Sequence, residues 1–268
     1  MKPIAKTIAA FALLSLLIGC ATTAQTPAPG GEKQPTDVFE SQDYFVTSAK
    51  AGDTAESLAA KFLGDAALAW MIEDYNGLTS VSPGQQVVIP KHFWNLPGVT
   101  PSGYQLVPIL VYHNLAPQSK GRMILGAKAF EEQMRYLKSS GYRVITLKQF
   151  IEFISFKRQL PQKSVLLTFD DGFRSFLQYA YPVLKELSFS ATLFVYTDYL
   201  GAGGNALTWA DLKKLTQEGF DVQAHSKSHG DMVRAANEPA GEYERRLQAE
   251  LTQPRALFEK NLGFDPNI

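Results

Sequence analysis

Two short runs of residues combine carboxylates and imidazoles at spacings that suit a catalytic metal site. The first, residues 166–172, is an apolar segment that ends in the adjacent carboxylates Asp170 and Asp171 and a glycine. The second follows another apolar segment and places His225 and His229 four residues apart. One Asp and two His would supply three protein ligands to a metal ion and leave a position for water. The other Asp would be available as a general base, so the pattern predicts a metal-dependent hydrolase if the two runs meet in space.

Each run taken alone has an ordinary structural explanation. An Asp-Asp-Gly sequence after a strand is commonly a turn that caps the next helix. Two histidines four residues apart are commonly solvated, and the Glu of the His-Glu-x-x-His pattern is absent after His225. His113 also follows an apolar segment and is a candidate pocket residue. The combination is the stronger signal, because three of the four histidines lie at or just past predicted strand ends.

The elements that must position these residues alternate along the second half of the chain. Apolar runs predict strands at residues 107–112, 143–146, 165–169, 191–196 and 220–224. Helical patterns cover residues 128–139, 147–156, 173–187, 210–218 and 242–262. Thr208 and Asp211 predict a capping box at the fourth helix, which Gly219 ends. Such alternation predicts an α/β fold with a parallel sheet or a β/α barrel, in which functional residues gather at the carboxyl ends of the strands.

Residues 107–268 resemble the NodB-type polysaccharide deacetylases, carbohydrate esterase family 4. The resemblance rests on two motifs, Thr-Phe-Asp-Asp-Gly at residues 168–172 and His-Ser-Lys-Ser-His at residues 225–229. Three further segments resemble the branch that includes exported poly-N-acetylglucosamine deacetylases, at residues 111–113, 130–134 and 141–145. It implies that Asp171, His225 and His229 bind a divalent metal, Zn²⁺ in the first place with Co²⁺ or Ni²⁺ as alternatives. It also implies that Asp170 is the general base in hydrolysis of an N-acetyl group.

The predicted deacetylase domain stops early in comparison with that family. Family members continue with a Pro-containing motif, a motif with Asp and Trp, and a last strand that bears a catalytic His. The sequence stops at Ile268 after five predicted strands. Because an unclosed barrel leaves strand edges unpaired, we expect an incomplete (β/α) barrel that is truncated at its carboxyl-terminal end, and the enzymatic activity of such a chain stays open.

A smaller unit is predicted at residues 44–91. Its pattern is strand, helix, helix and strand, with turn sequences at residues 51–54, 76–78 and 83–85. This unit resembles the LysM module, a βααβ fold that binds chains containing N-acetylglucosamine, and the resemblance implies peptidoglycan as a partner. A spacer domain that binds no glycan is the alternative. Residues 92–106 are predicted to be a linker because prolines and glycines interrupt any regular element.

The amino terminus has the features of an export signal. Two lysines precede an apolar stretch at residues 8–18, which is too short to span a bilayer. The stretch leads to Cys20, the only cysteine of the chain, in a context that resembles the bacterial lipobox. We expect a lipoprotein signal peptide at residues 1–19, lipid on Cys20 and a flexible tether at 20–43; an uncleaved apolar segment is the alternative. Ala21 after the cysteine implies, by resemblance to Gram-negative sorting, an outer-membrane location facing the periplasm.

Composition narrows the possible partners. The 26 basic and 26 acidic residues cancel, so no net field attracts nucleic acid. A single cysteine excludes an internal disulfide framework. The leading hypothesis is a membrane-anchored, metal-dependent N-deacetylase of an N-acetylglucosamine polymer, either peptidoglycan or poly-N-acetylglucosamine. The alternative is a non-catalytic peptidoglycan-binding lipoprotein with a deacetylase remnant, and a hydrolase of small amides is disfavoured by the predicted glycan-binding module.

Overall fold

The structure of the chain is a computed structural model that describes residues 37–266. The predicted signal peptide, the predicted lipidation site Cys20 and most of the predicted tether lie outside the described residues. Within the described range, no helix is both long enough and apolar enough to cross a membrane.

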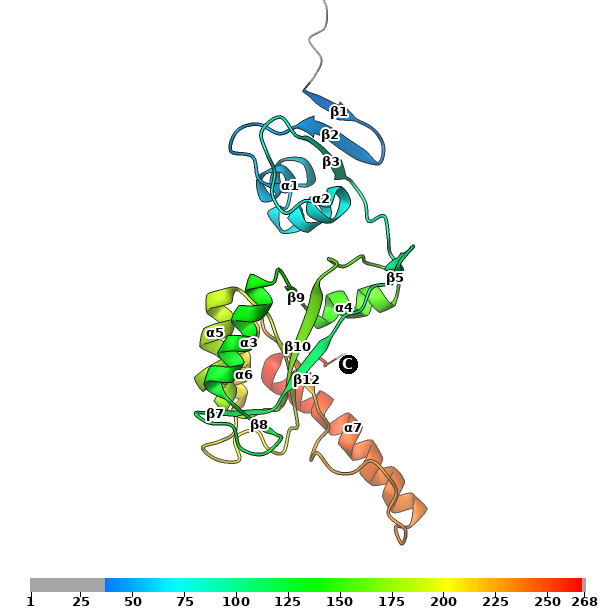
Figure 1. Ribbon diagram of the computed structural model, residues 1–268. Helices are drawn as coiled ribbons and strands as arrows, with labels where there is room; N and C mark the ends of the chain where they lie inside the picture. Colours follow the sequence, from blue (N-terminus) through cyan, green and yellow to red (C-terminus); the bar gives the residue numbers. More distant parts are fainter. Residues whose placement is uncertain (1–36, 267–268) are drawn as a thin grey trace, which may run out of the picture. The chain divides into compact units, whose positions relative to one another are not determined.

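The amino-terminal part of the described chain is a small βααβ unit (Figure 1). Its central strand β2 (Tyr44–Ser48) pairs antiparallel with β3 (Gln86–Pro90) and with β1 (Val38–Glu40). Between β2 and β3 lie α1 (Ala55–Leu63), the 3-10 turn η1 (Ala66–Leu68) and α2 (Ala69–Asn76). The strand β1 corrects the tether prediction, which extended to residue 43; three residues are too few to show the alternation that marks a strand.

Local sequence explains how this small unit is held together. Thr54 and Ser57 form a capping box at the start of α1. The side-chain amide of Asn76 donates to the carbonyl of Val88, and its oxygen accepts the Val88 N–H at 3.0 Å. Asn76 therefore joins the end of α2 to β3, over a core that includes the fully buried Ile72.

The larger part of the chain is built on one five-stranded sheet (Figure 1). Its main path runs β12 (Asp221–Ala224), β11 (Thr192–Val195), β10 (Ser164–Asp171) and β6 (Ile109–Tyr112), and β9 (Arg143–Ile145) also pairs with β10. All of these pairings are parallel. The predicted strands are therefore present. The strand β10 runs to Asp171, two residues beyond its predicted end, and so takes both carboxylates into the sheet.

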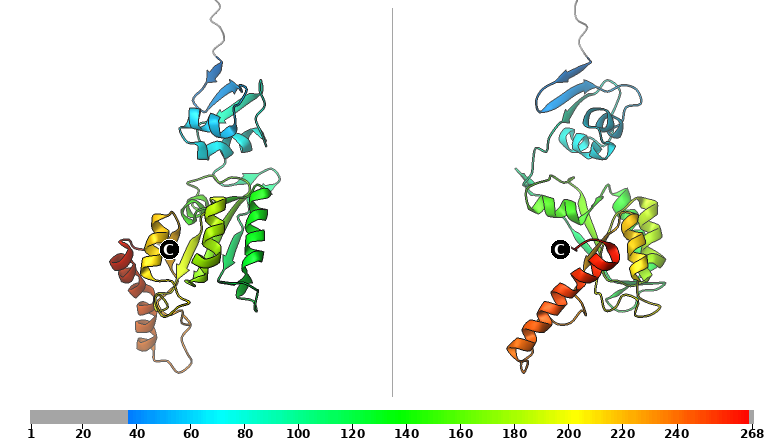
Figure 2. Two further views of the ribbon diagram at one scale, coloured as in Figure 1. Left: turned by 90° about the vertical axis from the view of Figure 1, so that its left-hand side faces the viewer. Right: turned by 180° about the vertical axis from the view of Figure 1, so that it is seen from behind.

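Helices cover the two faces of this sheet unequally. The helices are α3 (Ala127–Ser139), α4 (Leu147–Ile154), the π-helical turn η2 (Phe176–Ala180) that leads into α5 (Tyr181–Leu187), α6 (Trp209–Gln217) and α7 (Ala240–Leu262). The helices α3, α5 and α6 pack on one face, and α4 lies on the other (Figures 1 and 2). The amino-terminal half of α7 extends beyond the sheet (Figure 2). The predicted capping box of Thr208 and Asp211 starts α6 at Trp209.

Several very short elements differ from the prediction. The predicted linker at residues 92–106 contains a two-stranded hairpin of β4 (Val99–Thr100) and β5 (Gly103–Tyr104). Beyond β6, β7 (Asn114–Ala116) pairs with β8 (Ile124–Gly126). Strands of two or three residues are too short for hydrophobic periodicity to reveal. The sheet of the larger part is open: within residues 37–266 its edge strands β6 and β12 each pair on one side only.

Candidate metal centre

The two adjacent carboxylates end the central strand of the sheet. Successive side chains of a strand point in opposite directions, so Asp170 and Asp171 lie on different sides of β10. Asp171 has a φ of 75° and Gly172 a φ of 86°, and the strand therefore turns sharply here. At Gly172 a Cβ would lie 3.2 Å from Cγ1 of Val195. Glycine suits this position for two reasons: it adopts a positive φ without strain, and it leaves room for the Val195 side chain of β11.

The histidine pair lies on a tight loop after β12. The His225 N–H donates to the carbonyl of Val195 at 2.8 Å, which continues the parallel ladder by one residue. Ser226 (φ 70°) and His229 (φ 59°) both have left-handed backbones, and Ser226 Oγ accepts the His229 N–H at 3.0 Å. The loop folds back so that the two imidazole ring centroids are 5.0 Å apart.

Three side chains converge in a ligand set. The ligand atoms of Asp171, His225 and His229 all lie within 4.8 Å of one another. Oδ1 of Asp171 is 3.4 Å from Nε2 of His229 and 4.0 Å from Nε2 of His225. This oxygen is buried, and no described residue donates a hydrogen bond to it. Because a buried carboxylate oxygen without a partner is destabilising, and an Asp-His-His set is one that divalent metals accept, the residues fit a cation.

The second carboxylate lies beside another histidine. His113 directly follows β6, whose Tyr112 is opposite Phe169 of β10. Nε2 of His113 is 3.9 Å from Oδ2 of Asp170. Burial raises the pKa of Asp170 above its ordinary value, whereas positive charge on His225 and His113 opposes the rise. A carboxylate whose pKa is raised towards neutrality is a better general base. The structure thus brings together all five residues that the sequence singled out around the predicted site.

Two tyrosines that no sequence motif singles out complete one side of the centre. The ring of Tyr196 packs on His229, with 5.2 Å between the ring centroids, and stacks on Tyr199 at 5.1 Å. Burial and the charge of Asp171 raise the pKa of both tyrosines. Tyr196 directly follows β11, so its position just past a strand end is the one signal that could have found it.

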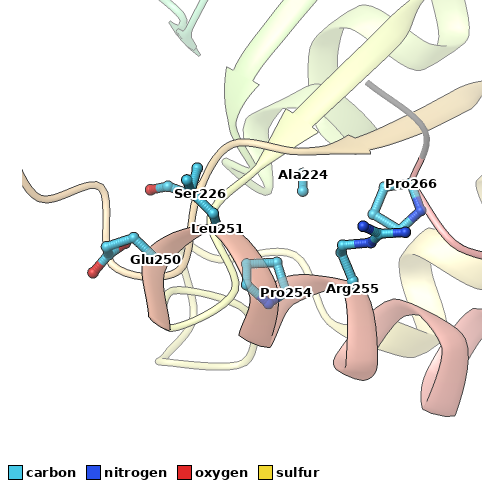
Figure 3. Close-up of a pocket in the computed structure, with 7 residues that line it drawn as sticks. All are labelled: Ala224, Ser226, Glu250, Leu251, Pro254, Arg255 and Pro266. Atoms are coloured by element: carbon cyan, nitrogen blue, oxygen red, sulfur yellow. The ribbon is translucent and has the colours of Figure 1, made fainter. Parts of the chain in front are cut away.

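A hollow lies between the histidine loop and α7 (Figure 3). Ala224 and Ser226 form its sheet side, and Glu250, Leu251 and Pro254 line it from α7. The hollow therefore adjoins the backbone that carries the two histidines, on the side that α7 covers.

Sequence comparisons point to one family. Residues 157–268 match the family model described as polysaccharide deacetylase. The chain is 30% identical over 121 residues to poly-beta-1,6-N-acetyl-D-glucosamine N-deacetylase of Staphylococcus aureus, over 41% of each chain. It is also 30% identical over 153 residues to YxkH of Bacillus subtilis, which bears a provisional polysaccharide deacetylase name, over 57% of this chain and 51% of the relative. The chain thus spans about half the length of these relatives or less.

Solved structures share the architecture. The deacetylase PplD of Streptococcus pyogenes, in complex with acetate, superposes with a TM-score of 0.53 and 27% identity, over 59% of this chain and 70% of that one. IcaB from Ammonifex degensii superposes with a TM-score of 0.52 and 26% identity over the same shares. Residues 157–268 therefore match the polysaccharide deacetylase family, and the parallel sheet agrees with the architecture of these solved structures.

Proposed function

We propose that the chain is a metal-dependent hydrolase that removes N-acetyl groups from an N-acetylglucosamine-containing polysaccharide of the cell envelope. The observation that carries the proposal is the convergence of Asp171, His225 and His229 around an unpartnered buried oxygen. The relative from Staphylococcus aureus, whose name specifies poly-beta-1,6-N-acetyl-D-glucosamine, supports this polymer as the first candidate substrate. Peptidoglycan is the second candidate substrate.

The residues of the centre divide the proposed work between them. Asp171, His225 and His229 hold the divalent cation, Zn²⁺ first, with Co²⁺ and Ni²⁺ as alternatives. When bound, the cation polarises the acetyl carbonyl and makes water more acidic. Asp170 accepts a proton from the attacking water, the water oxygen bonds to the acetyl carbon, and the carbon–nitrogen bond breaks. The proton that Asp170 accepted goes to the leaving nitrogen, so Asp170 is again a carboxylate and the products are acetate and a free amino sugar. His113 lies next to this base, with its Nε2 3.9 Å from Oδ2 of Asp170.

Two further parts of the chain would bring the centre to its substrate. Residues 44–91 are proposed to be a LysM-like module that binds peptidoglycan, and the order strand, helix, helix, strand supports this assignment. Lipid on Cys20 is proposed to anchor the exported chain in the outer membrane, facing the periplasm. The proposed LysM-like module and the proposed metal centre would both engage N-acetylglucosamine polymers, which is the reason to prefer a polysaccharide over a small amide.

An assay of acetate release tests the proposal. The full chain is purified with Zn²⁺ or Co²⁺ and incubated with β-1,6-linked N-acetylglucosamine oligomers or with peptidoglycan. Asp170→Asn is expected to keep metal binding and lose acetate release. Glu186→Gln, an exposed residue paired with Arg135 on the helical face, is the charge-matched control. No acetate from the wild-type chain, with retained cosedimentation with peptidoglycan, would refute the catalytic role and favour a binding lipoprotein.

A further inference from the structure

A buried carboxylate from α7 reaches into the loop that carries both metal-site histidines. Glu250 is only 6% exposed. Its Oε2 accepts the N–H of Lys227 at 3.0 Å and the N–H of Ser228 at 2.8 Å. Its Oε1 accepts the hydroxyl of Ser228. A single side chain therefore accepts two of the three backbone N–H groups that lie between His225 and His229.

The loop needs such an acceptor because of its backbone conformation. Ser226 and His229 both have left-handed backbones, a region that residues other than glycine adopt rarely. The N–H groups of Lys227 and Ser228 belong to no strand or helix, so Glu250 supplies the acceptor that secondary structure does not. Gly230 helps to keep that acceptor in place. A Cβ on Gly230 would lie 3.1 Å from Ser228 Oγ, close enough to press the serine away from Glu250.

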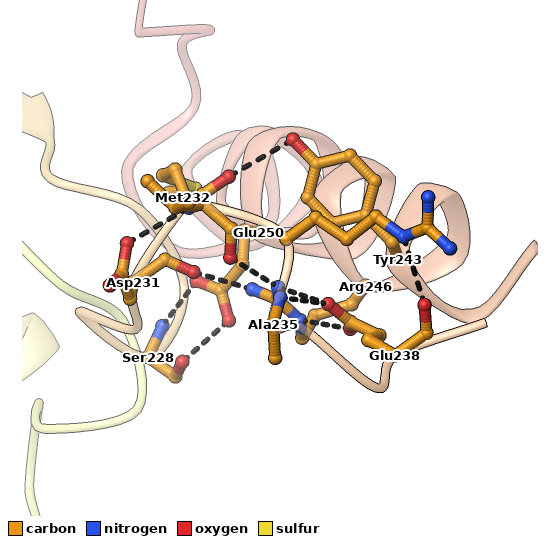
Figure 4. A network of polar contacts seen from close by, with 10 residues as sticks. Ser228, Asp231, Met232, Ala235, Glu238, Tyr243, Arg246 and Glu250 are labelled. Atoms are coloured by element: carbon orange, nitrogen blue, oxygen red, sulfur yellow. Dashed lines mark hydrogen bonds and ion pairs between the residues drawn. The ribbon is translucent and has the colours of Figure 1, made fainter. Parts of the chain in front are cut away.

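The helix that supplies Glu250 is itself tied to the segment after His229 (Figure 4). Arg246 donates to both carboxylate oxygens of Glu238, at 2.8 and 2.9 Å, and to the carbonyl of Asp231 at 2.5 Å. The Tyr243 hydroxyl donates to the carbonyl of Met232 at 3.0 Å. Arg246 and Glu250 are four residues apart and so lie on the same face of α7. The helix α7 is therefore joined to the loop within the histidine turn and again just after His229.

Both oxygens of the Glu250 carboxylate accept hydrogen bonds from the loop. Although burial favours its neutral form, the hydrogen bonds from Ser228 and Lys227 hold the pKa of Glu250 below its ordinary value. The group thus carries a negative charge whose two oxygens face the loop backbone and the Ser228 hydroxyl. This arrangement holds a loop in shape.

We propose that Glu250 is a positioning residue of the metal centre. Through this carboxylate, α7 fixes the turn at residues 226–228 and thereby sets how His225 and His229 face Asp171. The inference rests on the proposed function, because the geometry it protects is that of the proposed metal ligands. It predicts that metal affinity depends on a residue that does not belong to the ligand set.

Two substitutions of Glu250 separate hydrogen bonding from charge and size. Glu250→Ala removes every acceptor. Glu250→Gln keeps one oxygen for the two N–H groups, and its amide nitrogen can donate to the Ser228 hydroxyl. Glu250→Asp keeps the charge but is one methylene shorter, so it tests the same reasoning if the alanine variant does not fold. Glu259→Ala, an exposed glutamate on the same helix, is the control.

The readouts are amide hydrogen exchange at Lys227 and Ser228 in the metal-free full chain and the affinity for Zn²⁺ from chelator competition. In Glu250→Ala we expect faster exchange at both amides and Zn²⁺ binding weakened roughly 10- to 100-fold, as for other residues that orient metal ligands. The Co²⁺ visible absorption of this variant should also change. Glu250→Asp should shift in the same direction, and Glu250→Gln should restore most of both properties. Glu259→Ala should match wild type.

Three results would overturn the positioning role alone, and they differ from failure of the proposed function. Exchange at Lys227 and Ser228 that is unchanged in Glu250→Ala, or unchanged Zn²⁺ affinity despite faster exchange, overturns the positioning role alone. A wild-type chain that binds neither Zn²⁺ nor Co²⁺ overturns the proposed metal centre and the inference with it. A Glu250→Gln variant as weak as Glu250→Ala would also contradict positioning by hydrogen bonds.

Discussion

Replacing Asp171 by Asn should make the metal-free protein more stable while it abolishes metal binding. The carboxylate is 13% exposed, and its Oδ1 is buried with no hydrogen-bond donor among residues 37–266. Asn has nearly the same shape and tolerates the left-handed backbone at this position. The substitution therefore removes a buried charge without adding strain.

The magnitude follows from the unpartnered oxygen. A buried polar group without a partner costs about 1–3 kcal/mol, and more when it is charged. Because Asn still places one polar atom at the site of Oδ1, we expect it to recover only the lower part, about 1 kcal/mol. For a domain of this size, that gain raises Tm by about 2–4 °C. Saturating metal reverses the order, since a ligand at a hundred times its Kd stabilises the wild type by about 2.7 kcal/mol.

Thermal and urea unfolding of both proteins, with EDTA and with Zn²⁺, measure the two differences. Both proteins are compared in the same buffer at one pH. Asp221→Asn on β12 is the matched control. Its carboxylate already accepts from the Gln223 amide at 2.8 Å and from the Thr192 hydroxyl at 3.3 Å, so it should lose stability or stay unchanged.

A metal-free Asp171→Asn protein that is less stable than wild type would refute the reasoning. It would mean that the carboxylate has a stabilising partner, such as water or an imidazolium, in solution. A gain in stability in both variants would point instead to a general effect of removing negative charge.

Three further substitutions test how the elements around the centre are held. Gly172→Ala should destabilise the fold by more than about 1 kcal/mol, measured by urea unfolding, because alanine meets both a φ of 86° and the Val195 side chain. Thr208→Ala should lower the urea midpoint by about 1 kcal/mol with an unchanged m value, since the cap of α6 is lost. Asn76→Ala should cost about 1–3 kcal/mol in thermal unfolding, because it leaves the N–H and C=O of Val88 without their side-chain partner. A wild-type midpoint in any of the three would contradict the corresponding contact.

The strands that build the centre could be predicted because their sequences agree with their environment. Residues 164–169 of β10 are buried throughout, and the run at residues 165–169, which is apolar except for Thr168, is typical of a strand that is buried on both faces. The next turn is marked by Gly172, and the cap at Thr208 is visible as a local pattern. The register of the parallel strands then places Asp170 beside Phe194 and Asp171 beside Val195, which in turn is opposite Ala224 at the end of β12.

The parts that escaped prediction depend on contacts between distant residues. Glu250 belongs to a helix with many charged residues, and nothing local distinguishes it from the exposed Glu259 on the same helix. Its role arises only when α7 packs against the loop at residues 226–228. Likewise, the short pair β7 and β8 is defined by its partner strand and not by its own composition.

Backbone strain at the metal centre helps to decide between an enzyme and a non-catalytic remnant. Asp171, Ser226 and His229 all have left-handed backbones, and each such residue costs on the order of 1–3 kcal/mol. A protein that only binds glycan through its LysM-like module has no use for the strained backbones at this centre. A bound cation, by contrast, gives the unpartnered oxygen and both imidazoles a common partner. The retention of this strained and complementary arrangement therefore favours a centre that still binds metal.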